Sequence, residues 1–221
     1  MTSPLAPGTP GPDQWRFRGD RALTGSGDPP LSRTIGDLVD EMAGRAPEIE
    51  AVVFGAARLT YAALQQHANA VALGLLARGI NKGDHVGILL GNRTEWMVAW
   101  IAANKIGATV VGISTWSSSR ELEYILRHSD TRMLIYGDAL GQRNLSAVVD
   151  ECLTTAGWSG AARFSPQLPC LRSTLMIRTD GDALASFDKL TRDGLAVRPG
   201  MLAALARDVR AADVALLLYT S

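Results

Sequence analysis

Two adjacent hydroxyl side chains, Thr220 and Ser221, directly follow the apolar run 214–219. The run is rich in strand-forming residues, so we expect a strand that is buried on both faces in the middle of a sheet. Open α/β sheets bind their ligands just beyond the carboxyl ends of the strands. Thr220 and Ser221 are therefore candidate ligand contacts, although a hydroxyl pair after a strand is also ordinary turn chemistry.

A second candidate position is Trp116, which follows the apolar stretch TVVGI in a serine-rich loop. A tryptophan on a loop at the end of a strand is either a ligand-facing platform or an ordinary surface side chain. Trp96 and Trp100 differ from it, because they are four residues apart on an expected helix and so belong to its buried face.

The remaining candidates for chemistry indicate no site. The three histidines are isolated from one another and from any nucleophile signature: His67, His85 and His128. Ser186 and Lys189 match a Ser-x-x-Lys pattern without its companion motifs, so we treat the match as coincidence. Cys152 and Cys170 lack the spacing of a zinc site or a disulfide framework, and we expect two idle thiols and no metal site.

The elements that must position these residues alternate between helix and strand. Thr34 is expected to cap a helix that ends at Ala46, and a strand pair follows at 51–54 and 58–60. Three helix-then-strand units come next: helices within 60–79, 92–107 and 117–130, and strands at 85–90, 108–113 and 132–136. In the third unit, Ser118 and Glu121 fit a capping box. Such units favour right-handed crossovers and a mainly parallel sheet flanked by helices.

The later elements are a helix at 144–154, a loop at 157–169, a strand at 171–177, short helices at 186–190 and 200–209, and the final strand. Residues 1–30 are rich in Pro, Gly and Ser, which predicts a flexible or surface-draped leader. We therefore expect the folded α/β part to cover residues 31–221.

Composition excludes several function classes. The 221 residues include 22 basic and 22 acidic side chains, so no surplus of positive charge favours nucleic-acid binding. No secretory signal and no apolar stretch long enough to span a membrane is evident, which predicts a cytoplasmic protein. Composition leaves open whether the protein forms a homo-oligomer.

Three stretches, in this order, resemble the adenylate-forming (AMP-binding) superfamily and specifically its acyl-CoA synthetases. LTYAALQQHANAVALGLLARGINKGDHVGILLGN is similar to the first signature, and IAANKIGATVVGISTWSSSRELEYILRHSDTRMLI is similar to the next. DVALLLYTS resembles the strand that enters the phosphate loop of the family, which normally continues with a glycine-rich sequence. The resemblance covers residues 34–221 and implies the first subdomain of the large N-terminal domain, incomplete at its C-terminal end.

The resemblance also implies a reaction. A carboxylic acid attacks the α-phosphate of ATP, with Mg²⁺, to give an acyl-adenylate, and the thiol of coenzyme A then displaces AMP. Thr220 and Ser221 would be the first hydroxyl donors to the ATP phosphates. The catalytic lysine and the adenine site of such enzymes lie in later sequence, which would be supplied by the remainder of the polypeptide, on one chain or two. We therefore expect no catalytic residue in this segment, and we expect the segment alone to be inactive.

One departure from the family concerns coenzyme A. Many relatives have Asn-Pro-Arg after the strand that corresponds to TVVGI, and that arginine can contact the phosphates of coenzyme A. This sequence has STW there, with Trp116 at the basic position. Arg120, one helical turn further on, is a candidate substitute, although a plain surface arginine is the alternative. The alternative functions are an adenylation domain that loads a carrier-protein thiol, or a relative that only performs thioesterification or binds an acyl-adenylate.

Overall fold

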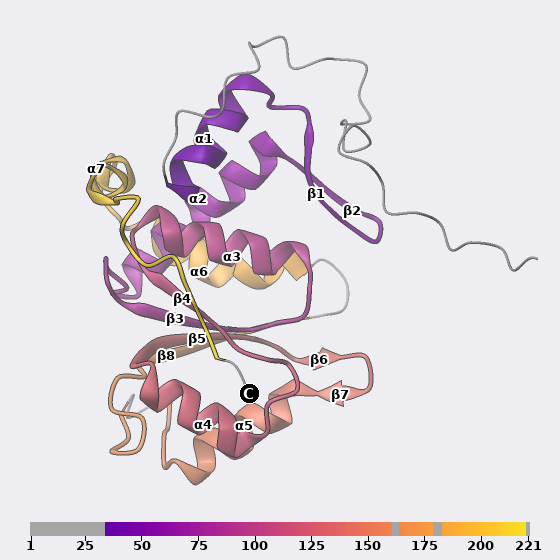
Figure 1. Ribbon diagram of the computed structural model, residues 1–221, viewed down its shortest axis with the longest axis vertical. Coiled ribbons are helices and arrows are strands. Elements are labelled where there is room, and N and C mark those ends of the chain that lie inside the picture. Colours follow the sequence, from indigo (N-terminus) through magenta and orange to yellow (C-terminus); the bar gives the residue numbers. More distant parts are fainter. Residues whose placement is uncertain (1–33, 161–163, 179–182, 220–221) are drawn as a thin grey trace, which may run out of the picture.

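A five-stranded parallel sheet forms the centre of the protein (Figure 1). The computed structural model describes residues 34–160, 164–178 and 183–219. The strand order is β8-β5-β3-β4-β9, and all four neighbouring pairs are parallel. The strands are β3 (His85–Leu89), β4 (Thr109–Gly112), β5 (Thr131–Gly137), β8 (Ser173–Ile177) and β9 (Leu216–Leu218). The prediction of a mainly parallel sheet is confirmed.

Helices cover both faces of this sheet. Figure 1 shows α2, α3 and α6 on one side and α4 and α5 on the other. The helices are α1 (Ile35–Arg45), α2 (Tyr61–Ala77), α3 (Thr94–Lys105), α4 (Ser119–His128), α5 (Leu145–Thr155), α6 (Asp188–Gly194) and α7 (Met201–Asp208), with a 3₁₀-helix η2 (Ala183–Phe187) before α6. The expected helices therefore all form, with boundaries shifted by a few residues.

The central strands bury alternate side chains in two separate cores. In β5, Met133 and Ile135 belong to the core under α2 and α3, whereas Leu134 and Tyr136 belong to the core under α4 and α5. This two-sided burial follows from the two-residue period of a strand and explains why the strand sequences are continuously apolar. Trp96 and Trp100 pack against the first core, as predicted.

Local signals in the sequence set the helix ends. The side chains of Thr34, Thr60, Ser118 and Asn144 each accept a hydrogen bond from a backbone N–H in the first turn of the helix that follows. Ser118 and Glu121 form both bonds of the predicted capping box. These caps start α1, α2, α4 and α5 at defined positions relative to the strand ends.

Two antiparallel hairpins stand apart from the main sheet. The first, β1 (Glu50–Phe54) with β2 (Ala57–Thr60), matches the predicted strand pair. The second, β6 (Ala139–Leu140) with β7 (Arg143–Asn144), was not predicted and directly precedes α5. The second hairpin lies beyond the carboxyl end of β5, which makes it part of the candidate site.

The expectation for residues 214–219 is partly wrong. They contain the strand β9, but it is only three residues long and pairs with β4 alone among the described residues, so it lies at an edge of the sheet. Leu218 is 66 % exposed, because no described element covers its side of the strand. A continuous apolar run indicates a strand but does not tell whether other strands pair with it on both sides, and this is why the sequence suggested a central position.

Candidate functional site

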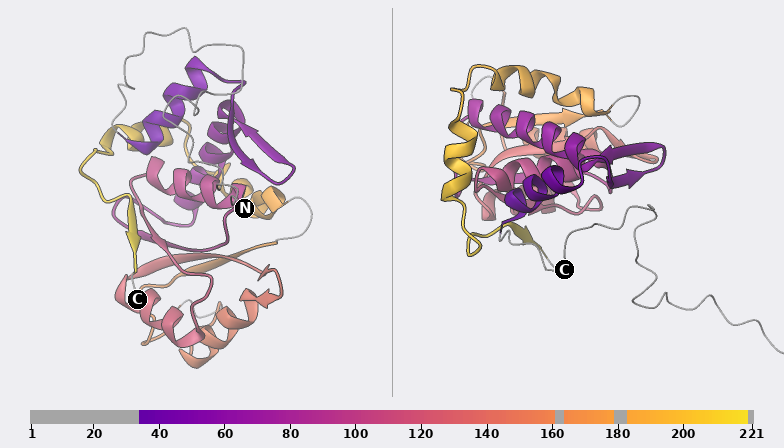
Figure 2. Two further views of the ribbon diagram at one scale, coloured as in Figure 1. Left: turned by 45° about the vertical axis from the view of Figure 1, so that its right-hand side comes forward. Right: turned by 90° about the horizontal axis from the view of Figure 1, so that it is seen from above.

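The carboxyl ends of the parallel strands meet at one edge of the sheet, and the loops that follow β4 and β5 lie there. Figures 1 and 2 show the end of β9 close to α4 at this edge. Trp116 lies in the loop between β4 and α4, and the β6–β7 hairpin follows β5. Ligands of open α/β sheets bind at such an edge, so these loops define the candidate functional site.

Trp116 is the most exposed large aromatic side chain of this edge, with 75 % of its surface accessible. The guanidinium carbon of Arg143 lies 5.7 Å from the centroid of its ring, which is within cation–π distance. An Arg143 guanidinium nitrogen also donates a hydrogen bond of 2.7 Å to the carbonyl oxygen of Ser117. The hairpin and the β4–α4 loop therefore present an arginine and a tryptophan as one unit.

Arg143 is held in place by the geometry of its hairpin. Gly141 adopts a positive φ of 59°, which lets the chain turn between β6 and β7. A Cβ atom at Gly91 would lie 2.8 Å from Leu140, so the glycine lets the hairpin approach the end of β3 closely. The Nε of Arg143 is buried and has no hydrogen-bond partner among the described residues. The hydrogen bond to the Ser117 carbonyl therefore orients the guanidinium, and further N–H donors of the group stay available.

The predicted substitute, Arg120, does not join this unit. Its side chain is exposed on the first turn of α4, and within the described residues the cation–π partner of Trp116 is Arg143. Sequence reasoning missed Arg143, which is the cation that actually lies at Trp116. The glycine of the short segment LGQRN was the available signal for a hairpin, but nothing in the sequence indicated which loop the arginine would contact.

Glu121 supplies negative charge beside the Trp116 loop. Its carboxylate accepts hydrogen bonds from the backbone N–H of Ser118 (2.7 Å) and from the Ser118 hydroxyl (2.8 Å). These bonds, the backbone one first, and the charge of Arg143 lower the pKa of Glu121 below its ordinary value. The carboxylate is therefore ionised at neutral pH and is occupied in capping α4.

An aromatic cluster fastens the end of β9 to α4. The Tyr219 hydroxyl lies 2.8 Å from Nδ1 of His128, and the two rings meet edge to face with centroids 5.8 Å apart. Tyr124 stacks on His128 at 5.3 Å and meets Tyr219 edge to face. The pKa of Tyr219 is raised above its ordinary value, mainly because the side chain is partly buried. The predicted donors Thr220 and Ser221 lie outside the described residues, directly after this anchored tyrosine.

The remaining sequence candidates are not brought together with this edge. The Ser186 hydroxyl accepts a hydrogen bond from the backbone N–H of Arg178 (2.9 Å), which is a structural contact. Both cysteines are free thiols, and burial raises the pKa of Cys152 to about 12, so this thiol is unreactive. Within residues 34–160, 164–178 and 183–219, no group of three His, Cys, Asp or Glu side chains could hold a metal ion.

A model of the AMP-binding enzyme family matches residues 39–221. The chain therefore belongs to the AMP-binding enzymes. It is 33 % identical over 147 residues to the acyl-CoA ligase SID4 of Ajellomyces capsulatus, a match that covers 66 % of this chain and 24 % of the relative. It is 28 % identical over 193 residues to the acyl-CoA ligase sidI of Aspergillus fumigatus, covering 86 % of this chain and 32 % of the relative. The chain thus spans a quarter to a third of the length of these relatives.

The fold matches solved structures of the same class. The N-terminal domain of FACL13 from Mycobacterium tuberculosis is similar with a TM-score of 0.62 and 26 % identity, and the match covers 85 % of this chain and 42 % of that one. A Mycobacterium tuberculosis fatty acyl CoA synthetase aligns with a TM-score of 0.56 over 86 % of this chain and 33 % of its own. The fold is that of the first part of the N-terminal domain of adenylate-forming enzymes. No helix of the described residues is long and apolar enough to cross a membrane.

Proposed function

We propose that this chain is part of an AMP-forming acyl-CoA synthetase that acts on a small carboxylic acid in the cytoplasm. The observation that carries the proposal is the family match over residues 39–221, which includes the strand β9 and the hydroxyl pair after it. The acyl-CoA ligase names of the relatives support the choice of acceptor. The same reaction would use residues outside this chain for the adenine site and for the catalytic lysine.

In the proposed first step, a carboxylate oxygen attacks the α-phosphorus of ATP and pyrophosphate leaves, with Mg²⁺ on the phosphates. Thr220 and Ser221 would donate hydroxyl hydrogen bonds to the departing phosphates and so favour the charge that develops on them. The contacts of Tyr219 with His128 and Tyr124 support this role, because they fix the chain immediately before the two donors. In the second step, the thiol of coenzyme A attacks the acyl carbon and AMP leaves.

We assign the coenzyme A side of the site to Trp116 and Arg143 rather than to Arg120. An arginine that is stacked on an exposed indole offers a cation for a phosphate and a flat apolar surface for a planar group. Among the described residues, Arg143 combines these features, because its guanidinium carbon lies 5.7 Å from the centroid of the Trp116 ring. In this way a residue from the β6–β7 hairpin would replace the arginine that many relatives have at the position of Trp116.

The reaction is tested by ATP–pyrophosphate exchange on the intact gene product with a panel of acids, followed by assay of CoA thioester formation. Acid-dependent exchange together with thioester formation supports the proposal. If exchange occurs but the acyl group is transferred to a carrier-protein thiol and not to free coenzyme A, the protein is a carrier-loading adenylation domain instead. Failure of exchange with every acid would refute it.

The placement of coenzyme A is tested by Arg143→Met, with Arg120→Met as the matched control. Loss of one charged hydrogen bond costs about 1.5–3 kcal/mol, so Arg143→Met should raise the KM for coenzyme A about tenfold or more and leave ATP–pyrophosphate exchange unchanged. Arg120→Met should change neither quantity. The reverse pattern would assign the contact to Arg120.

A further inference from the structure

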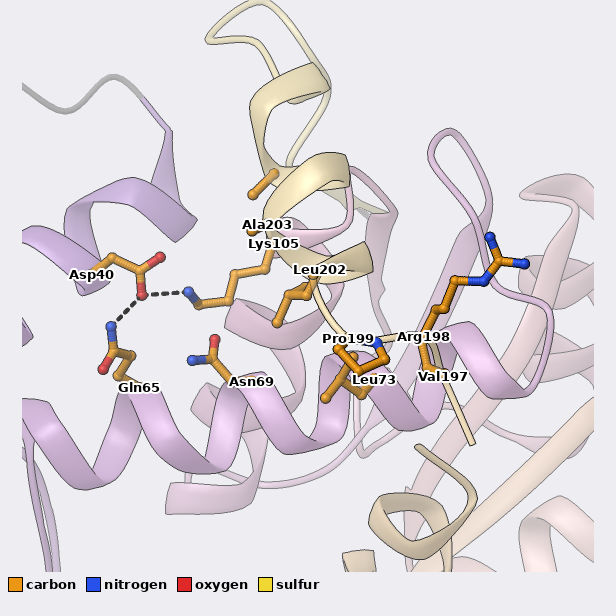
Figure 3. Close-up of a pocket in the computed structure, with 12 residues that line it drawn as sticks. Asp40, Gln65, Asn69, Leu73, Lys105, Val197, Arg198, Pro199, Leu202 and Ala203 are labelled. Carbon is orange, nitrogen blue, oxygen red and sulfur yellow. Dashed lines mark hydrogen bonds and ion pairs between the residues drawn. The ribbon is translucent and has the colours of Figure 1, made fainter. Parts of the chain in front are cut away.

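A cavity of about 340 Å³ lies among α1, α2, α3 and the start of α7 (Figure 3). One of its residues, Lys105, ends α3 just before β4 begins. The cavity therefore lies toward the edge where the strands start, whereas the Trp116 loop lies at the edge where they end. Its size falls within the range of small-molecule pockets. It is separate from the candidate functional site.

The polar end of the cavity is built around the buried amine of Lys105. Only 3 % of this side chain is exposed, and its Nζ lies 2.5 Å from Oδ1 of Asp40. The same carboxylate oxygen accepts a hydrogen bond of 2.7 Å from the amide nitrogen of Gln65. An ammonium group carries three N–H donors, and only the one to Asp40 has a partner among the described residues. Two buried donors of Lys105 are therefore free for an acceptor.

Further polar groups without partners among the described residues belong to residues that line the cavity. The N-cap residue of α7 is Gly200, which has no side chain that could cap the helix. The backbone N–H groups of Leu202 and Ala203 have no hydrogen-bond partner within the described ranges. Helix N-termini with free N–H groups favour anions. The side-chain oxygen of Asn69 is also buried without a partner in the described part of the chain. Donors without partners thus outnumber acceptors at this end.

The rest of the cavity is apolar. Figure 3 shows Leu73 and Leu202 on facing helices, while the guanidinium of Arg198 extends away from the Lys105 end. Asp40 is 40 % exposed, so it stays hydrated if a second carboxylate shares the ammonium of Lys105. The added negative charge would be balanced by the positive end of α7. The cavity therefore matches an acceptor-rich anionic head on a short apolar body.

We propose that this cavity binds a small monocarboxylic acid, with its carboxylate at Lys105 and the α7 N-terminus and its hydrocarbon part against Leu73 and Leu202. A carboxylate fits best because it is acceptor-only and makes short, strong bonds to an ammonium group and to backbone N–H groups. The oxygen of Asn69 offers an acceptor to a hydroxyl on the same ligand, so a 3-hydroxy acid is expected to bind more tightly than its parent acid. The inference concerns a site apart from the proposed reaction and does not depend on it.

A cysteine placed in the cavity reports binding there without any activity measurement. Ala203 lines the cavity and Ala204, next to it, does not, and both are exposed. In the intact protein, the variants Ala203→Cys and Ala204→Cys are labelled with a neutral maleimide, and the labelled peptide is quantified by mass spectrometry. Hexanoate at about ten times its Kd should slow labelling at position 203 about tenfold and leave position 204 unchanged.

Three comparisons decide the outcome. Hexanol and hexylamine should protect the cysteine at position 203 from labelling much less than hexanoate does. This comparison is made in a protein that keeps Lys105. Adding Lys105→Met should abolish the protection, with unchanged labelling at position 204 as the check that α7 is still folded. Equal protection by hexylamine, full protection in the Lys105→Met variant, or no protection by hexanoate would each overturn the proposal.

Discussion

The contact between α2 and α6 leaves no room for a side chain at Gly74. A Cβ atom there would lie 2.3 Å from the carbonyl oxygen of Leu190 and 2.6 Å from its Cγ. On the partner helix, a Cβ at Gly194 would lie 2.7 Å from the backbone nitrogen of Gly74. The two helices therefore meet backbone to backbone. This contact, together with the 2.7 Å ion pair between Arg78 and Asp193, fixes the segment that continues to α7 and β9.

We expect Gly74→Ala to destabilise the 221-residue chain. The nearest approach must lengthen by about 1 Å, from 2.3 Å to an ordinary contact of 3.4 Å, and overpacking of this kind costs about 1–3 kcal/mol. Alanine is better than glycine inside a helix by about 1 kcal/mol, which offsets part of the cost. The net loss in the free energy of unfolding should be up to about 2 kcal/mol, and relative to a glycine-to-alanine change without a clash it should be about 1–3 kcal/mol.

Gly44→Ala is the matched control, because Gly44 lies in α1 and a Cβ there would meet nothing within 4 Å. This variant gains helix propensity without a clash, so its free energy of unfolding should be unchanged or higher by up to about 1 kcal/mol. Urea denaturation followed by circular dichroism measures both variants. If Gly74→Ala proves as stable as Gly44→Ala, the close backbone packing of α2 and α6 is refuted.

Two further predictions concern the candidate site. Removing the α4 cap with Ser118→Ala should cost about 1 kcal/mol at neutral pH. Because the pKa of Glu121 is lowered in the folded state, its carboxylate stabilises the fold fully above the ordinary pKa of 4.5, and this stabilisation is lost as the pH falls through the folded pKa. The difference in free energy of unfolding between the parent and Ser118→Ala should therefore narrow in acid. Urea titrations at several pH values measure this difference, and a constant difference would show that the capping box is not ionised. Tyr219→Phe removes the hydrogen bond to His128 in α4, so the amide hydrogens of β9 should exchange faster than in the parent, while those of β3 should exchange at the parent rate. If the exchange rates in β9 match those of the parent, the hydrogen bond does not hold the strand.

Local patterns in the sequence were sufficient to predict most of the fold. The capping box at Ser118 and Glu121 and the helix-then-strand alternation depend on neighbouring residues, and both are confirmed. The edge position of β9 could not be predicted, because it depends on whether a second strand pairs with β9 on the side away from β4. The roles of Thr220 and Ser221 stay a prediction, since these residues lie outside the described ranges.

Arg143 shows why the site was harder to predict than the fold. Its contact with Trp116 joins two loops that are separated by two elements in the sequence, and no local pattern encodes such a pairing. The sequence offered Arg120 because it is near Trp116 along the chain. In the structure, the arginine at cation–π distance from Trp116 is Arg143, whose hairpin lies close to Gly91. Whether Arg120 contacts coenzyme A stays a prediction.

The pairing of β9 with β4 has a consequence for how the chain folds. Val110 and Leu216 are direct partners in the sheet although more than a hundred residues separate them, whereas β3, β4 and β5 are joined by single helices. Closing so long a loop is entropically costly, so β9 should join only after the nucleus around β3 has formed. During synthesis on the ribosome, β4 would then present an open hydrogen-bonding edge for several seconds at ordinary elongation rates of about 5–20 residues per second.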